Sequence, residues 1–188
     1  MNGYNRSHAI LGTSEDCIAT HPSDMCVAMA ALDAVIYVQG VHGKRSIPFA
    51  EFHRLPGNTP HIETSLQPGE LITAVHLPAM PYAKRSHYLK VRDRASYEFA
   101  LASAAVVLDT EGGTIRSARI AMGGIGTRPW RSFEAEQVLK GARPEADVYN
   151  AAADAALKDA KPHTHNAFKT ELAKRTLINA LTTTGGMI

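Results

Sequence analysis

The chain has 188 residues and a mass of 20.3 kDa, enough for one ordinary domain or two small ones and too short for a larger array. Hydrophobic residues make up 45% of it, so a core can form without disulfides or metal ions, and the disordered, collagen-like and coiled-coil classes are excluded. The net charge of +2 is too small for the electrostatic footprint of a nucleic-acid-binding protein.

The sequence shows no signal for a membrane or for secretion. No apolar run approaches the ~20 residues that a membrane-spanning helix requires. The polar start of the chain lacks the basic and apolar regions of a secretory signal. The two cysteines, Cys17 and Cys26, are too few for a disulfide scaffold and form no CxxC motif, so we expect a reduced compartment or no redox role for the thiols.

The first half of the chain is predicted to form a small α+β unit. The leading stretch to Asp16 lacks periodicity, and a short strand is expected over 17–19. Ser23 is the expected N-cap of a helix over 25–32, with Asp24 in its first turn. The other expected elements are a hairpin over 35–38 and 45–48, one helical turn over 49–52, a loop over 56–60 and a strand over 71–77.

The second half places strands before helices. A linker between Pro78 and Pro81 precedes three strands that are expected to form an antiparallel meander, and three helices follow. The strands are expected over 87–91, 99–108 and 115–122, and the helices over 132–140, 146–161 and 166–183. Asn166 is the expected cap of the last helix. The predicted fold class is therefore α+β, in two units over 1–81 and 82–188.

Few residues carry a motif for chemistry by themselves. The sequence contains no GxxxxGK[ST] phosphate loop, GxSxG elbow or HExxH metal motif. The run Gly123-Gly124-Ile125-Gly126 follows a strand without a βαβ unit, which favours a tight turn over a dinucleotide fingerprint. His163 and His165 could share a metal ion, but zinc needs further ligands, so a place at a helix start is favoured. Cys26 is interpreted as a small core residue.

Several stretches, in order along the chain, resemble one protein family. They are CIATHPSDM over 17–25, GELI over 69–72, YLKVRDRASYEFA over 88–100 and RPWR over 128–131. Together they resemble the FAD-binding subunit of molybdenum hydroxylases, in the xanthine dehydrogenase and aldehyde oxidoreductase group. The resemblance covers essentially the whole chain.

The resemblance implies a fold for each half. Residues 1–81 correspond to a remnant of the second FAD-binding subdomain, and 82–188 to a C-terminal domain similar to that of the carbon monoxide dehydrogenase flavoprotein, with a three-stranded antiparallel sheet on three helices. The family's Gly-rich loops for the FAD diphosphate, and the cysteines of an extra iron–sulfur cluster, have no counterpart here. We therefore expect an N-terminally truncated subunit that binds FAD weakly or not at all by itself.

The resemblance assigns four residues to the cofactor site, each with a simpler structural alternative. Asp24 matches an aspartate that hydrogen-bonds the polar tail of the flavin, or is a plain charge at a helix start. Ile72 matches an apolar or backbone contact to the isoalloxazine, or is a strand core residue. Lys90 matches a lysine whose charge favours a reduced ring, or is a sheet-surface lysine. Phe99 matches an aromatic residue against the ring face, or belongs to the core.

The function implied is electron relay through FAD, from iron–sulfur clusters to an external acceptor, in a molybdenum-containing oxidoreductase of the aldehyde or xanthine type. The implied partners are the molybdenum cofactor large subunit and the iron–sulfur small subunit, with no nucleic acid and no membrane. No catalytic or metal-binding residue is assigned to this chain, which is expected to be inactive alone. The alternative is a non-catalytic assembly module that does not bind FAD. The expected location is cytoplasmic, or periplasmic by export with a partner subunit.

Overall fold

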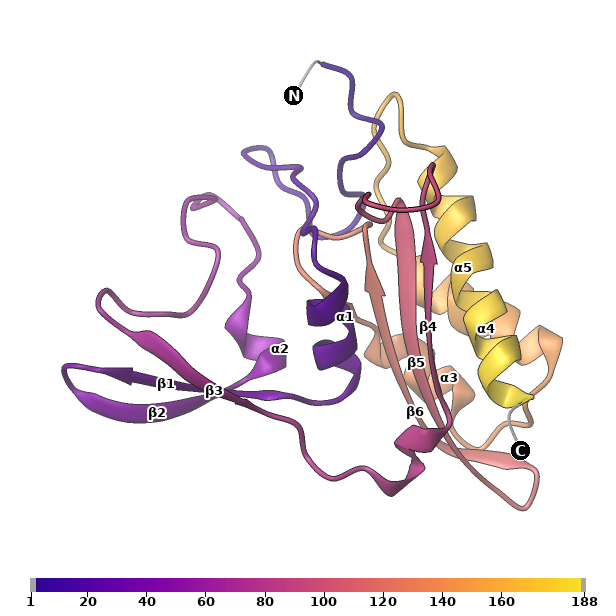
Figure 1. Ribbon diagram of the computed structural model, residues 1–188. Coiled ribbons are helices and arrows are strands. Elements are labelled where there is room, and N and C mark those ends of the chain that lie inside the picture. The colour runs from indigo at the N-terminus through magenta and orange to yellow at the C-terminus, as the bar shows by residue number, and fades with distance from the viewer. Residues whose placement is uncertain (1–2, 187–188) are drawn as a thin grey trace.

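The computed structural model of the protein describes residues 3–186. Residues 1–2 and 187–188, at the outer ends of the two expected units, lie outside the described residues. Two antiparallel sheets and two layers of helices make up the chain (Figure 1). The α+β class predicted from the sequence is confirmed.

The smaller sheet has three strands in the order β2-β1-β3. They are β1 (Val35–Gly40), β2 (Gly43–Pro48) and β3 (Leu71–His76). The predicted hairpin is confirmed: β1 and β2 pair in register from Val35 with Pro48 to Gly40 with Gly43, and the single turn α2 (Phe49–Phe52) follows directly. One face of this sheet packs on α1 (Asp24–Ala31) through Ile36 and Val38.

The larger sheet has four strands in the order β4-β5-β6-β7, all antiparallel. They are β4 (Ser86–Val91), β5 (Ala102–Glu111), β6 (Thr114–Gly123) and β7 (Trp130–Arg131). Three of these strands were predicted. The sheet has one strand more than the three that were expected, because Trp130 and Arg131 form a short edge strand on β6. A strand of two residues is too short to give a recognisable sequence pattern.

Three helices cover one face of the larger sheet, as predicted (Figure 1). They are α3 (Phe133–Leu139), α4 (Ala146–Leu157) and α5 (Phe168–Gly185). Fully buried side chains such as Ile120, Met122 and Leu177 fill the space between the layers. The leading loop enters this core as well, since Ile10 and Leu11 are buried and both donate their amides to the carbonyl of Ile125.

Helix α1 covers the opposite face of the larger sheet. The Ser23 hydroxyl accepts a hydrogen bond from the Cys26 amide, which confirms the predicted N-cap. Val27 and Ala30 of α1 pack with Ala105 of β5 and Ala121 of β6. The larger sheet is thus buried on both faces, and α1 is shared between the two sheets.

Two predicted strand segments lie in irregular structure instead. Residues 17–19 form no ladder: Ile18 accepts a bond from Ala9, and Cys17 from Ser14, which closes a local turn. Phe99 lies outside β5, because Tyr97 adopts a φ of 56°, in the left-handed region, and turns the chain before the strand begins. A 3-10 turn, η1 (Pro81–Lys84), directly follows the expected linker, which has no regular secondary structure.

Two helix boundaries also differ from prediction. Helix α4 ends at Leu157 rather than residue 161, because the Lys161 amide leaves the helix to donate to the carbonyl of Ile10. Asn166 does not cap α5. Its amide group spans the preceding loop, accepting from the amide of His163 at 2.5 Å and donating to the carbonyl of His8.

Within residues 3–186, no helix combines the length and the apolar character needed to cross a membrane.

Candidate functional site

The first turn of α1 brings together two of the four residues assigned from the sequence. The Asp24 carboxylate lies 2.6 Å from the Lys90 ammonium and accepts a bond of 2.8 Å from the Tyr88 hydroxyl. Lys90 and Tyr88 stand two residues apart on β4, so their side chains project from the same face of the strand. The Asp24 side chain is 47% exposed and that of Lys90 19% exposed, which leaves the pair open to a ligand.

Electrostatics at this pair favour the ionised carboxylate. Partial burial raises the pKa of Asp24, but hydrogen bonds from Lys90 and Tyr88, with the positive charges of Lys90 and Arg92, outweigh it and hold the pKa below its ordinary value. Burial raises the pKa of Tyr88, and the neighbouring carboxylate raises it further. At neutral pH Asp24 is therefore a carboxylate and Tyr88 a neutral phenol.

This donor and acceptor set suits part of a flavin nucleotide. A carboxylate accepts hydrogen bonds from hydroxyl groups such as those of a ribityl chain, whereas it repels a phosphate. The ammonium of Lys90 can donate to a ring carbonyl or stabilise negative charge that develops on a nearby ring. The residues present at the start of α1 therefore fit the hydroxylated and ring portions of FAD, and its diphosphate does not fit beside Asp24.

The glycine run at 123–126 does not supply a phosphate cradle either. A Cβ atom on Gly123 would come within 2.4 Å of the Val27 side chain, and one on Gly124, whose φ is +71°, would come within 2.7 Å of the Ala100 carbonyl. These glycines permit close packing of the chain on itself. The chain bends at these glycines directly after β6.

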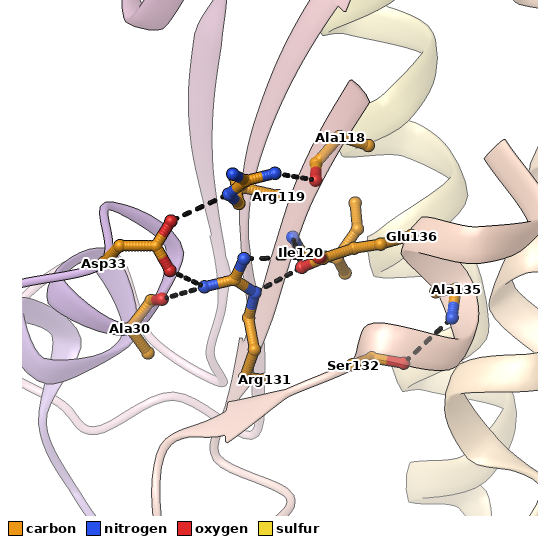
Figure 2. A network of polar contacts seen from close by, with 9 residues as sticks. All are labelled: Ala30, Asp33, Ala118, Arg119, Ile120, Arg131, Ser132, Ala135 and Glu136. Carbon is orange, nitrogen blue, oxygen red and sulfur yellow. Dashed lines mark hydrogen bonds and ion pairs between the residues drawn. The ribbon is translucent and has the colours of Figure 1, made fainter. Parts of the chain in front are cut away.

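The far end of α1 is fastened to the sheet by a charged network (Figure 2). The Arg131 guanidinium of β7 donates to the carbonyl of Ala30 and to the Asp33 carboxylate, each at 2.6 Å, and pairs with Glu136 of α3. Arg119 of β6 donates to the other oxygen of Asp33 at 2.8 Å. Because Asp24 lies at one end of α1 and this network at the other, the helix is held across the sheet from β4 to β7.

The backbone conformation and the neighbouring arginines of Asp33 both suit it to hold the end of α1. Its φ of 51° lies in the left-handed region, which aspartate tolerates better than most residues and which ends the helix there. Burial raises its pKa, but hydrogen bonds and positive charge from Arg119 and Arg131 lower it below the ordinary value. The carboxylate is therefore ionised at neutral pH and keeps α1 in place.

The other two assigned residues belong to different elements, Ile72 to β3 and Phe99 to the loop before β5. Ile72 is on β3, paired with Val38, and is 43% exposed, so its alternative as a strand core residue is wrong. Phe99 is 69% exposed, so a core role for it is wrong as well. It borders a cavity of about 410 Å³ together with Thr20 and Pro22, from the loop that leads into α1.

Sequence reasoning missed Tyr88 and Arg131. Tyr88 could have been found from its spacing of two from Lys90, which places both on one face of a strand. Nothing in the sequence connects Arg131 to Asp33, 98 residues away. His163 and His165 belong to no group of three potential metal ligands within the described part of the chain, and the amide of His165 donates to Asn5.

Two family profiles match the chain. The FAD binding domain in molybdopterin dehydrogenase matches residues 13–80, and the CO dehydrogenase flavoprotein C-terminal domain matches residues 87–184. The aldehyde oxidoreductase FAD-binding subunit PaoB of Escherichia coli is 50% identical over 183 residues, covering 96% of this chain and 54% of that subunit. The carbon monoxide dehydrogenase medium chain of Afipia carboxidovorans is 30% identical over 136 residues, covering 71% of this chain and 45% of that one.

Solved structures give the same result. Quinoline 2-oxidoreductase from Pseudomonas putida 86 aligns with a TM-score of 0.74 at 25% identity, over 98% of this chain and 60% of that one. Reconstituted CO dehydrogenase from Oligotropha carboxidovorans aligns with a TM-score of 0.77 at 25% identity, over 87% and 57%. The chain thus spans about half the length of the curated relatives it matches.

Proposed function

Since this chain belongs to the family of FAD-binding subunits of molybdenum hydroxylases, we propose that it forms part of the pocket for a flavin in an aldehyde-type or xanthine-type oxidoreductase. The observation that carries the proposal is the contact of Asp24 with Lys90 and Tyr88 at the start of α1. These residues come from both matched regions, so their contact is set by the packing of α1 on the larger sheet. We place the boundary of the two units between residues 81 and 82, in the gap between the two profile matches.

Each residue has a proposed task. Asp24 accepts a hydrogen bond from a hydroxyl of the flavin's polar tail, and Tyr88 helps to hold that carboxylate in place. Lys90 places a positive charge beside the ring, where it favours the electron-rich reduced form. Ile72 and Phe99 offer exposed apolar side chains to the ring system, Ile72 from β3 and Phe99 from the loop before β5.

The bound FAD would supply the electron transfer itself, accepting electrons from iron–sulfur clusters and passing them to an external acceptor. The chain's own residues orient the flavin and set its electrostatic surroundings. We propose the molybdenum cofactor large subunit and the iron–sulfur small subunit as partners, because relatives are named as FAD-binding subunits and medium chains of such dehydrogenases. The location we propose for the complex is the cytoplasm, with export to the periplasm on a partner subunit as the alternative.

A flavin titration of the purified chain tests the site. We expect quenching of flavin fluorescence, weak in absolute terms and similar for riboflavin and FAD, because the residues at α1 contact the ring and hydroxyl portions. Asp24→Asn and Lys90→Met are each expected to weaken binding roughly tenfold, which is the loss of one charge-assisted hydrogen bond. Lys84→Met, at an exposed lysine of η1, is the matched control and should leave binding unchanged.

Two outcomes contradict the assignment. If flavin binds but Asp24→Asn leaves the affinity unchanged, or if Lys84→Met weakens binding as much as Lys90→Met, the residues around Asp24 do not form the site. Co-expression with the large and small subunits then tests the partners separately. A complex that contains the chain but carries no flavin would favour the assembly module over the flavin pocket.

A further inference from the structure

Two histidines and a cysteine, distant in sequence, meet beside the start of α1. His21 precedes the helix, Cys26 lies in its first two turns, and His53 follows α2. One ligand atom from each, an imidazole nitrogen or the thiol sulfur, lies within 4.8 Å of the other two. Cys26 is partly buried and packs against the hydrophobic cluster around α1, so it lies at the edge of the core that the sequence predicted for it.

The two imidazoles lack the partners that buried histidines usually have. The rings of His21 and His53 meet edge to face, with their centroids 4.5 Å apart. The Nδ1 atom of each is buried and has no hydrogen-bond partner in the structure. Because a buried polar atom without a partner costs about 1–3 kcal/mol, two such atoms on neighbouring imidazole rings require an explanation.

We propose that His21, Cys26 and His53 form a binding site for a zinc ion. Nitrogen and sulfur ligands of this kind are those that zinc prefers, and hard cations such as Mg²⁺ prefer oxygen. Zinc bonds of about 2.0–2.3 Å place tetrahedral ligand atoms roughly 3.3–3.8 Å apart, so small side-chain rotations close the group around the ion. The thiol loses its proton to solvent on binding, and the sulfur coordinates as thiolate.

The surroundings leave room for a fourth ligand. His21 and His53 border a cavity of about 130 Å³ that also contains Glu63 and Thr127. That volume exceeds what a water molecule needs, so water can complete a four-coordinate site. Burial lowers the pKa of His21, partly offset by Glu63, and burial and nearby positive charge lower that of His53 to about 4. Both imidazoles are therefore neutral at pH 7, which is the form that binds metal.

One neighbour opposes the ion and another favours it. The Arg128 guanidinium, which donates to the backbone carbonyl of His53 at 3.3 Å, repels a cation. The carboxylate of Glu63 lies close enough to His21 to act on its charge, and its negative charge attracts a cation. A bound zinc ion would tie the loop before α1, the helix itself and the end of α2 into one unit, independently of whether flavin binds.

Metal titration of the chain tests the proposal. We expect one equivalent of Zn²⁺ to remain bound after gel filtration, no retention of Mg²⁺, and a higher melting temperature with Zn²⁺. Co²⁺ used as a spectroscopic substitute is expected to show thiolate-to-metal charge transfer in the near ultraviolet. Cys26→Ser should abolish that absorption and weaken Zn²⁺ binding by roughly tenfold or more, because loss of an outer-shell partner alone can cost that much.

Cys17→Ser is the matched control, since Cys17 borders the same cavity but is not in the ligand group. It should keep both the Co²⁺ absorption and the thermal shift. His53→Gln provides a second variant in case Cys26→Ser does not fold, which far-ultraviolet circular dichroism will show. The proposal is overturned if the chain retains no Zn²⁺, if folded Cys26→Ser keeps the absorption, or if Cys17→Ser loses it.

Discussion

The two sheets of this protein are buried very differently. Strand β5 of the larger sheet is buried from Ala102 to Asp109, with α1 on one face and the helical layer on the other. Every residue of β3, at the edge of the smaller sheet, is exposed. Both strands are rich in apolar residues, and β3 contains Leu71, Ile72 and Val75.

The difference shows that apolar content alone does not place a strand in a core. Burial depends on what the rest of the chain lays over each face, and only the larger sheet is covered on both. The hydrophobic effect stabilises in proportion to the area removed from water, so apolar residues of β3 contribute little to the stability of this chain. Stability should therefore be concentrated around β5, β6 and their two layers.

The largest effect is expected from a cavity in the larger sheet. Ile120 of β6 is fully buried, so Ile120→Ala removes packed methylene groups and leaves a void. We expect the free energy of unfolding to fall by about 4 kcal/mol, measured by urea denaturation. A loss below about 1 kcal/mol would show that the core relaxes around this position and would remove the contrast between the sheets.

A slightly smaller effect is expected where α1 is fastened to the sheet. Arg131→Met leaves Glu136, which is 8% exposed, without its cationic partner and releases the carbonyl of Ala30. We expect a loss of about 3 kcal/mol in the same urea assay, because one charge of a buried pair is left uncompensated. Arg119→Met is the control: that guanidinium is more exposed, and its loss should cost less than about 1 kcal/mol. Equal losses for the two variants would argue against a central role for Arg131.

Asp33 should make a smaller, pH-dependent contribution to the free energy of unfolding. Asp33→Asn keeps a residue that tolerates the left-handed backbone, and we expect it to cost at most about 1 kcal/mol at pH 7, since the side chain is 44% exposed and screened by water. The folded pKa of Asp33 lies below its ordinary value of 3.8. Its stabilisation is therefore complete above the unfolded pKa and is lost as pH falls through the folded pKa.

The measurement compares urea unfolding of the wild type and Asp33→Asn from pH 7 down to pH 3. The advantage of the wild type should shrink below pH 4 and not above it. An advantage that stays constant across this range would mean that the carboxylate charge does not hold α1.

The smallest effect is expected in the smaller sheet. Ile72→Ala makes the same chemical change as Ile120→Ala at a residue that is 43% exposed. We expect the free energy of unfolding to change by no more than about 0.5 kcal/mol. A loss comparable to that of Ile120→Ala would mean that β3 is buried in solution. The two sheets would then not differ in burial as described.

Much of the local structure followed from sequence patterns. The sequence predicted the Ser23 cap, the hairpin over 35–48 and most of the strands and helices after Pro81. Each of these depends on residues that are close together in the chain. The errors lie where a distant segment overrules the local pattern. The Asn166 side chain forms hydrogen bonds with the backbone of His163 and His8 instead of capping α5. Strand β7 forms by pairing with the edge of β6.

The candidate site divides in the same way. Asp24 and Lys90 were assigned from stretches of sequence that resemble the family. Tyr88 could have been predicted from the two-residue period of a strand, which places it on the same face as Lys90. The grouping of His21, Cys26 and His53 has no spacing that a motif could describe, since Cys26 and His53 lie 27 positions apart in the printed sequence.

The sequence by itself determined the class of fold, the order of its elements and the family to which the chain belongs. Only the tertiary structure decided which apolar strand is buried, which charges hold α1 across the sheet, and which histidines share a thiol. The physical reason is range: capping, turns and periodicity act over a few residues, whereas burial, ion pairing and ligand geometry depend on segments that meet only after the chain has folded.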